Sequence, residues 1–584
     1  MKISRRSLLG AAAAGTGLAL AGCSSSGSST TSAPTGGPFP TSWSNEQQID
    51  VFDGLANAMG VQPGWFAKMV HDKFNLKLNI IAPNVAGGGD TLYNTRVSAG
   101  NLGDFIVTDQ GQKLDDLVTG GLVMDISAMY KNMTNTAAFD AAVKHINDGK
   151  NGIFALPTQV SDLKPTQSSE GLDPTFGPFL RWDLYKKVGY PQIGTLEDLL
   201  PALKKMQDAA PTAPNGKKVY ALSLFKDWDG NMMNNAKQPT CYYGYDEMGF
   251  VLAKADGSDY QSIVDSGSQY VRALRFFAKA NQMGLLDPES PTQNYDTLFS
   301  KFQNGQVLFS FWPWQCQAAY NTTSNVKRGL GFEIAPMKDM LIFSYGVSVY
   351  GATQVIAIGS KAKDPQRIAA FMDWLYSPEG TYTNNSQTQG AAGPKGLTWQ
   401  LDSSGRPELT DFGWKALAGS GATVPASWGG GTYQNGSSWL NATLVLPIDK
   451  DKATGSEFSY KFWKTYQDAT ANPLSKDWSS RMGGATSTMD YLTKNGKIIV
   501  APGASYVTPT DTSEIQTLRN QIKAVIVQQS WKMSLSTSDS DFNAQLKSMQ
   551  DTVNGLGYSK VLAVDMANAK AQNAARVAVA KKFG

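Results

Sequence analysis

The chain has 584 residues, enough for two large lobes or several domains, and its formal net charge is +3 at pH 7. Of its 52 basic residues three lie in the first 22 positions, which leaves 49 basic against 49 acidic residues in the rest of the chain. This balance excludes the basic surface excess of nucleic-acid-binding proteins, and no nucleic-acid partner is expected.

The first 22 residues have the layout of a secretion signal. Lys2, Arg5 and Arg6 form a basic start, and an uncharged run rich in Ala, Gly and Leu follows over residues 7–22. This run is shorter than the ~20 residues that a membrane-spanning helix needs. The adjacent arginines resemble the twin-arginine export signal, and an ordinary secretory signal with the same basic start stays open as the alternative.

Residues 20–23, Leu-Ala-Gly-Cys, resemble the bacterial lipobox, whose cysteine becomes the first mature residue and carries diacylglycerol. The resemblance implies an exported protein that is anchored to the outer face of the cell membrane by a lipid on Cys23. Residues 24–40 are almost all Ser, Thr, Gly and Pro, a composition that cannot bury a core. We therefore expect residues 23–44 to form a flexible tether.

Helix and strand patterns alternate after the tether. Phe66, Val70 and Phe74 recur at four-residue steps, which predicts an amphipathic helix. Alternating or continuous apolar residues predict strands over 76–81 and 105–107. Repeated alternation of this kind is typical of an α/β fold with largely parallel sheets. Further segments with the expected patterns are helices at 93–99 and 114–118, and strands at 220–225 and 307–311.

Several segments match the motifs of one family when they are taken in chain order. Residues 149–157 read GKNGIFALP and residues 284–289 read GLLDPE. These segments resemble the extracellular solute-binding proteins of ABC importers (family 1), in particular the large branch that binds oligosaccharides and alginate. Residues 100–106 depart from the family pattern at Asn101 and Gly103, where an acid and proline are usual. The other matching segments are 120–126, 180–189, 195–199, 304–314 and 364–380.

The resemblance implies a periplasmic-binding-protein-like α/β fold, with two lobes joined by a hinge and a cleft between them. We expect one lobe to comprise residues 45–158 and 341–375, and the other residues 159–340 and 376–584. The resemblance also implies a monomeric substrate-binding lipoprotein that captures an oligosaccharide and delivers it to membrane permease subunits. No enzymatic activity, cofactor or metal is expected, and residues 207–216 lack the oxygen-ligand spacing of a calcium loop.

Sugars have apolar faces and a rim of hydroxyls, so their sites combine aromatic rings with carboxylate, amide and arginine groups. Ligands of α/β proteins bind at the carboxyl ends of parallel strands, and such residues follow the predicted strands here. Residues 181–182 come directly after the expected first crossing between lobes, and Trp428 lies in a glycine-rich loop. The predicted ligand-binding residues are Asp109, Gln110, Arg181, Trp182, Asp227, Trp228, Asp229, Trp312, Trp314 and Trp428.

Each of these residues also has a structural interpretation. Tryptophans at strand ends often pack in a core, Asp109 suits a helix cap, and Arg181 has an ion-pair partner nearby in Asp183. Two functions from other classes stay open: a secreted carbohydrate-active enzyme with paired carboxylates, and a sensory or peptide-binding lipoprotein of the same fold. The sequence does not determine whether Cys241 and Cys316 form a disulfide.

Overall fold

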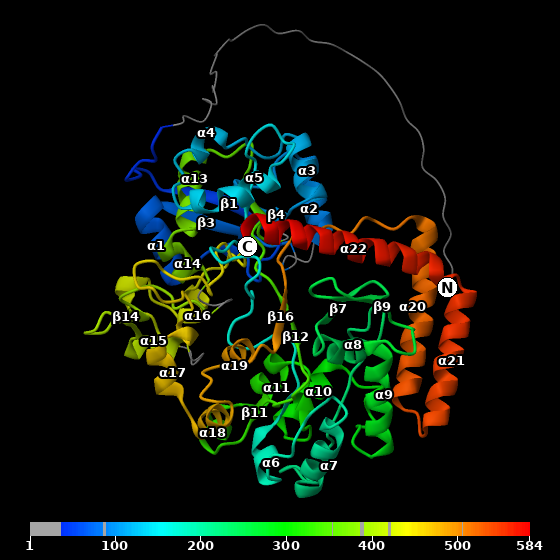
Figure 1. Cartoon of the computed structure of the whole chain (residues 1–584). Helices are drawn as coiled ribbons and strands as arrows, with labels where there is room; N and C mark the ends of the chain where they lie inside the picture. The colour runs from blue at the N-terminus through cyan, green and yellow to red at the C-terminus, as the bar shows by residue number, and fades with distance from the viewer. Residues whose placement is uncertain are drawn as a thin grey trace, which may run out of the picture.

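The computed structural model describes residues 37–584 apart from residues 84, 86–88, 353, 386–389, 418–421 and 505. The predicted signal, Cys23 and most of the tether lie outside the described residues. The described chain forms two α/β lobes, the upper and the lower one in Figure 1. None of the described helices combines the length and the apolar character that a membrane span requires.

Lobe 1 is built on a six-stranded sheet in the order β2-β3-β1-β4-β13-β5. Strands β1, β3 and β4 are parallel, and β13 runs antiparallel to β4. The strands are β1 (Gln47–Asp53), β2 (Gly60–Val61), β3 (Leu76–Ile81), β4 (Phe105–Asp109), β5 (Leu156–Pro157) and β13 (Gln354–Ile358). The helices are α1 (Gly64–Phe74), α2 (Gly89–Ser98), α3 (Gln112–Thr119), α4 (Ser127–Tyr130), η1 (Thr136–Phe139), α5 (Asp140–Ile146) and α13 (Pro365–Leu375).

The predicted helices and strands of this lobe agree with those of the structure. Phe66, Val70 and Phe74 are buried on one face of α1, as their spacing predicts. Strand β3 has the predicted bounds, and β4 extends two residues past the predicted strand, to Asp109. Strand β1 was not predicted, although it pairs with both β3 and β4 at the centre of the sheet.

Residues 378–463, called the extension below, join the core of lobe 1. This differs from the expected division, which assigned everything after residue 375 to the other lobe. Aromatic packing explains the difference: Trp65 of α1 stacks on Tyr433 with ring centroids 5.2 Å apart. The extension contains α14 (Pro378–Asn384), β14 (Trp399–Leu401), β15 (Pro407–Leu409), α15 (Asp411–Leu417), η2 (Ala426–Trp428), α16 (Tyr433–Gly436), η3 (Tyr460–Phe462) and, at its exit, α17 (Lys464–Thr470).

Lobe 2 has its own hydrophobic core, drawn from residues 176–343 and 474–561. Its strands are β6 (Phe179–Arg181), β7 (Tyr245–Met248), β8 (Val251–Lys254), β9 (Tyr260–Ser262), β10 (Phe309–Ser310), β11 (Phe332–Ile334), β12 (Ile342–Tyr345) and β16 (Ile498–Ala501). Its helices before residue 500 are α6 (Trp182–Lys187), α7 (Leu199–Ala209), α8 (Asn234–Cys241), α9 (Gln269–Gln282), α10 (Tyr295–Gln303), α11 (Pro313–Tyr320), α12 (Thr323–Lys327), α18 (Pro473–Arg481) and α19 (Thr488–Lys494).

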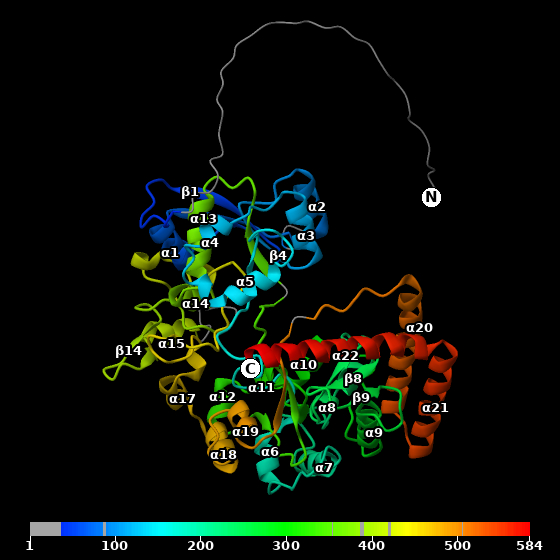
Figure 2. The same ribbon diagram turned by 45° about the horizontal axis from the view of Figure 1, so that its top comes forward.

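The chain ends in three long helices, α20 (Ser513–Ser534), α21 (Asp539–Gly555) and α22 (Tyr558–Phe583). Helices α20 and α21 form an antiparallel pair beside α9, and α22 runs from them toward the junction between the lobes (Figures 1 and 2). There the ring of Phe583 contacts Tyr350, which stacks on His145 of lobe 1 with centroids 3.9 Å apart. The C-terminus therefore lies at the lobe junction.

The chain passes between the two cores at residues 161–175, at residues 346–352 and at residues 464–473. The second of these crossings follows β12, which pairs in parallel with β16. Lobes connected in this way can move relative to each other about the crossing segments.

Candidate ligand-binding site

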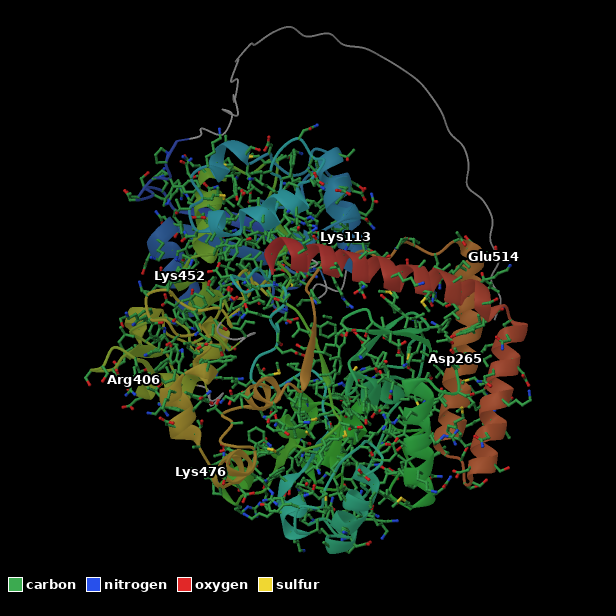
Figure 3. The ribbon with its side chains drawn as sticks, viewed as in Figure 1. Lys113, Asp265, Arg406, Lys452, Lys476 and Glu514 are labelled. Carbon is green, nitrogen blue, oxygen red and sulfur yellow. The ribbon has the colours of Figure 1, made fainter. Side chains whose placement is uncertain are left out.

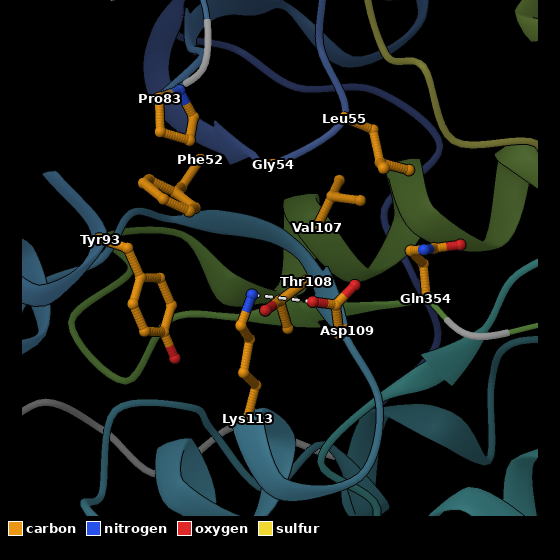
Figure 4. A pocket seen from close by; sticks show the side chains of 10 residues that line it. All are labelled: Phe52, Gly54, Leu55, Pro83, Tyr93, Val107, Thr108, Asp109, Lys113 and Gln354. Atoms are coloured by element: carbon orange, nitrogen blue, oxygen red, sulfur yellow. Dashed lines mark hydrogen bonds and ion pairs between the residues drawn. The ribbon is translucent and has the colours of Figure 1, made fainter. Parts of the chain in front are cut away.

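Lobe 1 contains a cavity of about 240 Å³ at the carboxyl ends of its parallel strands (Figure 4). Phe52 and Gly54 come from the end of β1, Pro83 follows β3, and Thr108 and Asp109 end β4. The side chains around this cavity are called the lobe 1 half-site. Its other members are Leu55, Tyr93, Val107, Lys113 and Gln354.

Asp109 and Lys113 supply the charges of the lobe 1 half-site. The Lys113 ammonium lies 2.8 Å from the carboxylate of Asp109, which is four residues earlier in the chain, and 5.5 Å from the centroid of the Tyr93 ring. Both side chains are about half exposed, so a ligand can reach them. Figure 3 places Lys113 at the margin of lobe 1 that faces lobe 2. The next residue, Gln110, donates its side-chain N–H to the carbonyl of Ala352 in the second crossing, at 2.8 Å.

Asp53, at the end of β1, is a fully buried acid next to this cavity. One carboxylate oxygen accepts the backbone N–H groups of Leu55 and Ala56, at 2.8 and 3.1 Å. Burial raises the pKa of Asp53 to about 6, although these hydrogen bonds act in the opposite direction. Asn441 of the extension donates its side-chain N–H to the Leu55 carbonyl at 2.9 Å, so the extension supports the loop after β1.

Lobe 2 presents a cluster of four rings that we call the aromatic platform: Trp228, Tyr295, Trp312 and Trp314. Trp228 stacks on Tyr295 with centroids 5.0 Å apart and lies 5.8 Å from Trp314. Trp228 and Trp314 are each 44% exposed, whereas Trp312 is 4% exposed and supports them from below. Trp314 projects from the start of α11, where Pro313 occupies the first turn. These two exposed indoles, tilted by 33° to each other, provide apolar ring faces of the kind that sugar rings stack on.

Strand pairing brings both surfaces to the lobe junction. In lobe 1, β13 begins just after the second crossing, and its first residue Gln354 lies opposite Asp109 at the end of β4. In lobe 2, the first crossing leads into β6, whose first residue Phe179 pairs with Ser310 at the end of β10. The carboxyl ends of β4 and β10 therefore both lie where crossing segments leave their lobes. The lobe 1 half-site and the aromatic platform flank the same junction.

Asp227 and Asp229, on either side of Trp228, hold its loop in place. Asp227 accepts the backbone N–H of Tyr295 at 2.9 Å. The two oxygens of Asp229 accept the backbone N–H of Asn234 at 2.9 Å and the indole N–H of Trp531 at 2.7 Å. Asp227 is exposed and retains acceptor capacity for a ligand, whereas Asp229 has both oxygens occupied.

Arg181 and Trp182 lie within the core of lobe 2. Trp182 is 1% exposed, and its indole N–H donates to Asp477 at 2.8 Å. Arg181 forms two hydrogen bonds with Asp183, at 2.8 and 2.9 Å, and its guanidinium lies 4.1 Å from the centroid of the Tyr320 ring. Because their polar groups are satisfied inside the protein, we leave both residues out of the proposed site.

Trp428 lies apart from the lobe junction, in η2 of the extension. It lines a different cavity of about 310 Å³, together with Tyr382 and Trp399. The lobe 1 half-site shares no residue with this cavity. We therefore leave Trp428 out of the proposed site as well.

Cys241 and Cys316 are both buried free thiols and do not form a disulfide. Burial raises the pKa of Cys241 to about 12, which keeps this thiol protonated and unreactive at neutral pH. Among the described residues, no group of three or more His, Cys, Asp or Glu side chains could hold a metal ion.

The sequence analysis did not single out Asp53, Tyr93, Lys113, Tyr295 or Asn441. Lys113 could have been found from its opposite charge and short chain spacing to Asp109, since the end of β4 lies close to the start of the following helix α3. Tyr295 follows the helix cap Asn294, and nothing in its neighbourhood predicts a stack with Trp228.

Residues 60–382 match the model of the bacterial extracellular solute-binding protein family. The chain belongs to this family. It is therefore an exported solute-binding protein and not an enzyme, as expected from the sequence. The extension beyond α14 and helices α20 to α22 follow the matched segment. No curated protein sequence matches the chain.

Solved structures share the periplasmic-binding-protein-like α/β fold of this solute-binding protein. The Streptococcus pneumoniae ABC-transporter substrate binding protein FusA in complex with kestose is 13% identical, with a TM-score of 0.54 over 90% of this chain and 100% of that chain. An HMO-binding solute-binding protein from Bifidobacterium longum infantis is 13% identical, with a TM-score of 0.55 over 90% and 98%. The alginate-binding protein AlgQ2 is 14% identical, with a TM-score of 0.50 over 90% and 98%. At these identities the likeness shows the fold alone.

Proposed function

We propose that this protein is the substrate-binding lipoprotein of an ABC importer and captures an oligosaccharide between its two lobes. The observation that carries the proposal is the pairing of two complementary surfaces at one junction. The aromatic platform offers exposed rings to the apolar faces of sugars, and the lobe 1 half-site offers Asp109, Lys113 and Gln354 to their hydroxyls.

Capture needs no covalent chemistry. A sugar that binds one surface first brings hydroxyl groups close to the other surface, and closing the lobes then completes the hydrogen bonds. The contacts made only in the closed form shift the equilibrium toward that form, by the difference in affinity between the two states. Dispersion and apolar contacts with Trp228 and Trp314 supply affinity, while the polar side chains of lobe 1 supply orientation.

The names of structural relatives support this class of ligand. FusA is described in complex with kestose, and two others are described as HMO-binding and alginate-binding. These relatives are distant, so the proposal depends primarily on the arrangement of this chain's own side chains. The ABC permease subunits are the proposed recipients of the captured sugar.

The proposed attachment is a lipid on Cys23, followed by the tether to residue 44. Such an anchor keeps the lobes near the membrane surface, where a permease takes over the ligand. Replacing Cys23 with Ala should release the exported protein into the medium or periplasm, while the wild type stays in the membrane fraction. A variant that fractionates like the wild type would refute the anchor.

A thermal-shift screen on the protein from residue 24 onward tests the ligand class. The panel contains neutral oligosaccharides, acidic oligosaccharides and peptides, since a ligand at 100 times its dissociation constant adds about 2.7 kcal/mol to native stability. We expect a shift with one sugar class, and no shift when Trp228 and Trp314 are both replaced with Ala. A shift with peptides alone would favour a peptide-binding protein of the same fold and refute the sugar proposal.

A further inference from the structure

The loop that carries Trp228, residues 226–233, is attached to two different parts of lobe 2. On one side Asp227 accepts the backbone N–H of Tyr295 at 2.9 Å, and Tyr295 also stacks on Trp228. Both residues lie within the segment that matches the family model. The attachment on the other side comes from α20, which follows this segment by more than a hundred positions.

Two consecutive residues of α20 form the second attachment. The indole N–H of Trp531 donates to Asp229 at 2.7 Å, directly next to Trp228 in the chain. The hydroxyl of Ser530 lies 2.8 Å from the hydroxyl of Tyr270, which accepts the backbone N–H of Met233 at 2.8 Å. The middle of the loop at Asp229 and its end at Met233 are therefore held by adjacent positions of one helix.

Helix α20 is itself fixed at this end. The side-chain N–H of Asn281, in α9, donates to the carbonyl of Leu535 at 2.9 Å, just after the last residue of α20. Ile526 and Met533, on the face of α20 toward the core, are fully buried in the hydrophobic core of lobe 2. Because its lower end cannot shift easily, α20 provides a rigid support for the loop.

We propose that Trp531 is a positioning residue for ligand capture, which holds Trp228 in its stacked orientation through Asp229. The inference rests on the proposed function, because it assumes that Trp228 contacts the ligand. Trp531 itself packs against the core of lobe 2. Its indole N–H acts on the ligand only through the Asp229 carboxylate and the backbone next to Trp228.

Loss of this hydrogen bond has a definite physical consequence. Asp229 is a partly buried carboxylate whose pKa is raised by burial, and the bonds from Trp531 and Asn234 offset that effect. In a Trp531→Phe variant one carboxylate oxygen of Asp229 loses its donor, and the loop keeps only the attachment to α20 that runs from Ser530 through Tyr270 to Met233. The Trp228 ring then samples more orientations, and binding must order it, which weakens affinity.

Fluorine NMR on protein labelled with 5-fluorotryptophan tests the inference without any ligand. The Trp228 resonance is assigned from its loss in Trp228→Phe. We expect it to broaden, shift or split in Trp531→Phe. The matched control is Trp478→Phe, because Trp478 is a buried tryptophan of the same lobe whose N–H donates to the Ile334 carbonyl at 3.4 Å. An unchanged Trp228 resonance in Trp531→Phe would overturn the inference.

A binding measurement adds a second readout. With the sugar that shifts the wild type, we expect Trp531→Phe to weaken affinity roughly three- to tenfold, and Trp478→Phe to leave it unchanged. The effects of Trp531→Phe and Asp229→Ala should not add in the double variant, since both remove the same hydrogen bond. Additive effects would contradict the proposal that Trp531 acts on Trp228 through Asp229. If the wild type binds no sugar, the proposed function fails, and the fluorine signal alone decides the positioning role.

Discussion

The two surfaces at the lobe junction are built in opposite ways. The lobe 1 half-site is polar: an exposed ion pair and a glutamine line a cavity of about 240 Å³, and the buried acid Asp53 lies next to it. The aromatic platform of lobe 2 is a set of rings that support one another, with two indoles open to solvent. Rings bind many sugars with similar strength, whereas hydrogen-bonding groups distinguish them. We therefore expect lobe 2 to determine affinity and lobe 1 to determine which ligand is accepted.

The largest expected effect comes from removing an exposed ring. Trp228→Ala and Trp314→Ala should each weaken ligand binding by about 2–4 kcal/mol, because each removes a large apolar contact at the centre of the site. Stability should change much less, since each ring is 44% exposed in the free protein. Calorimetric titration with the ligand found in the screen measures the first effect, and urea unfolding measures the second. Unchanged affinity in both variants would refute the proposal that the aromatic platform of lobe 2 determines ligand affinity.

The next effect concerns the stability of lobe 1 and its dependence on pH. The pKa of Asp53 is about 6 in the folded protein, against about 3.9 in an unfolded chain. The folded state therefore holds this proton more tightly, and the ionised carboxyl costs up to about 3 kcal/mol of stability above pH 6. That cost disappears as the pH falls toward 4.

Asp53→Asn should accordingly be more stable than the wild type at pH 7, and the difference should vanish near pH 4. Urea unfolding of the two proteins at both pH values measures this. The informative quantity is the difference in the free energy of unfolding between the two proteins. Burial also raises the pKa of Asp449 to about 6, and the titration of Asp449 affects the stability of both proteins equally. A stability difference that does not vary with pH would contradict the account of Asp53.

A smaller effect is expected from Asp109, on the surface of the same half-site. Asp109→Ala should weaken ligand binding by about 1 kcal/mol, the contribution of one hydrogen bond, and should change stability by less than about 0.5 kcal/mol. The control is Asp72→Ala, which removes another exposed pair of the same spacing, Lys68 with Asp72 at 2.7 Å. Equal effects of the two variants on affinity would show that Asp109 does not contact the ligand.

The smallest effect is expected from Trp428. Because it lines a separate cavity with Tyr382 and Trp399, Trp428→Ala should leave ligand affinity within about twofold of the wild type. The same titration measures it. A large loss of affinity would mean that the extension contributes a third surface to the ligand site.

Local sequence patterns predicted much of lobe 1. The spacing of Phe66, Val70 and Phe74 located α1, because apolar residues on one helix face must repeat every three or four positions. Trp228 and Trp314 were proposed as ligand contacts because ligands of α/β folds bind where strands end. The strand predicted over 220–225 is wrong, since this segment forms only isolated bridges at Tyr220 and Leu222, whereas the strand predicted over 307–311 is present as the shorter β10. Strand β1 was missed, although it ends in Asp53, the buried acid next to the lobe 1 half-site.

The sequence by itself determined the fold class and the family, since these depend on short-range periodicity and on motifs in chain order. Only the tertiary structure decided which candidates face the junction. Trp182 donates to Asp477 and Asp229 accepts from Trp531, across 295 and 302 positions of the chain. The extension likewise joined lobe 1 through the stack of Trp65 on Tyr433. A local pattern contains no information on such partners, because burial depends on side chains that only folding brings into contact.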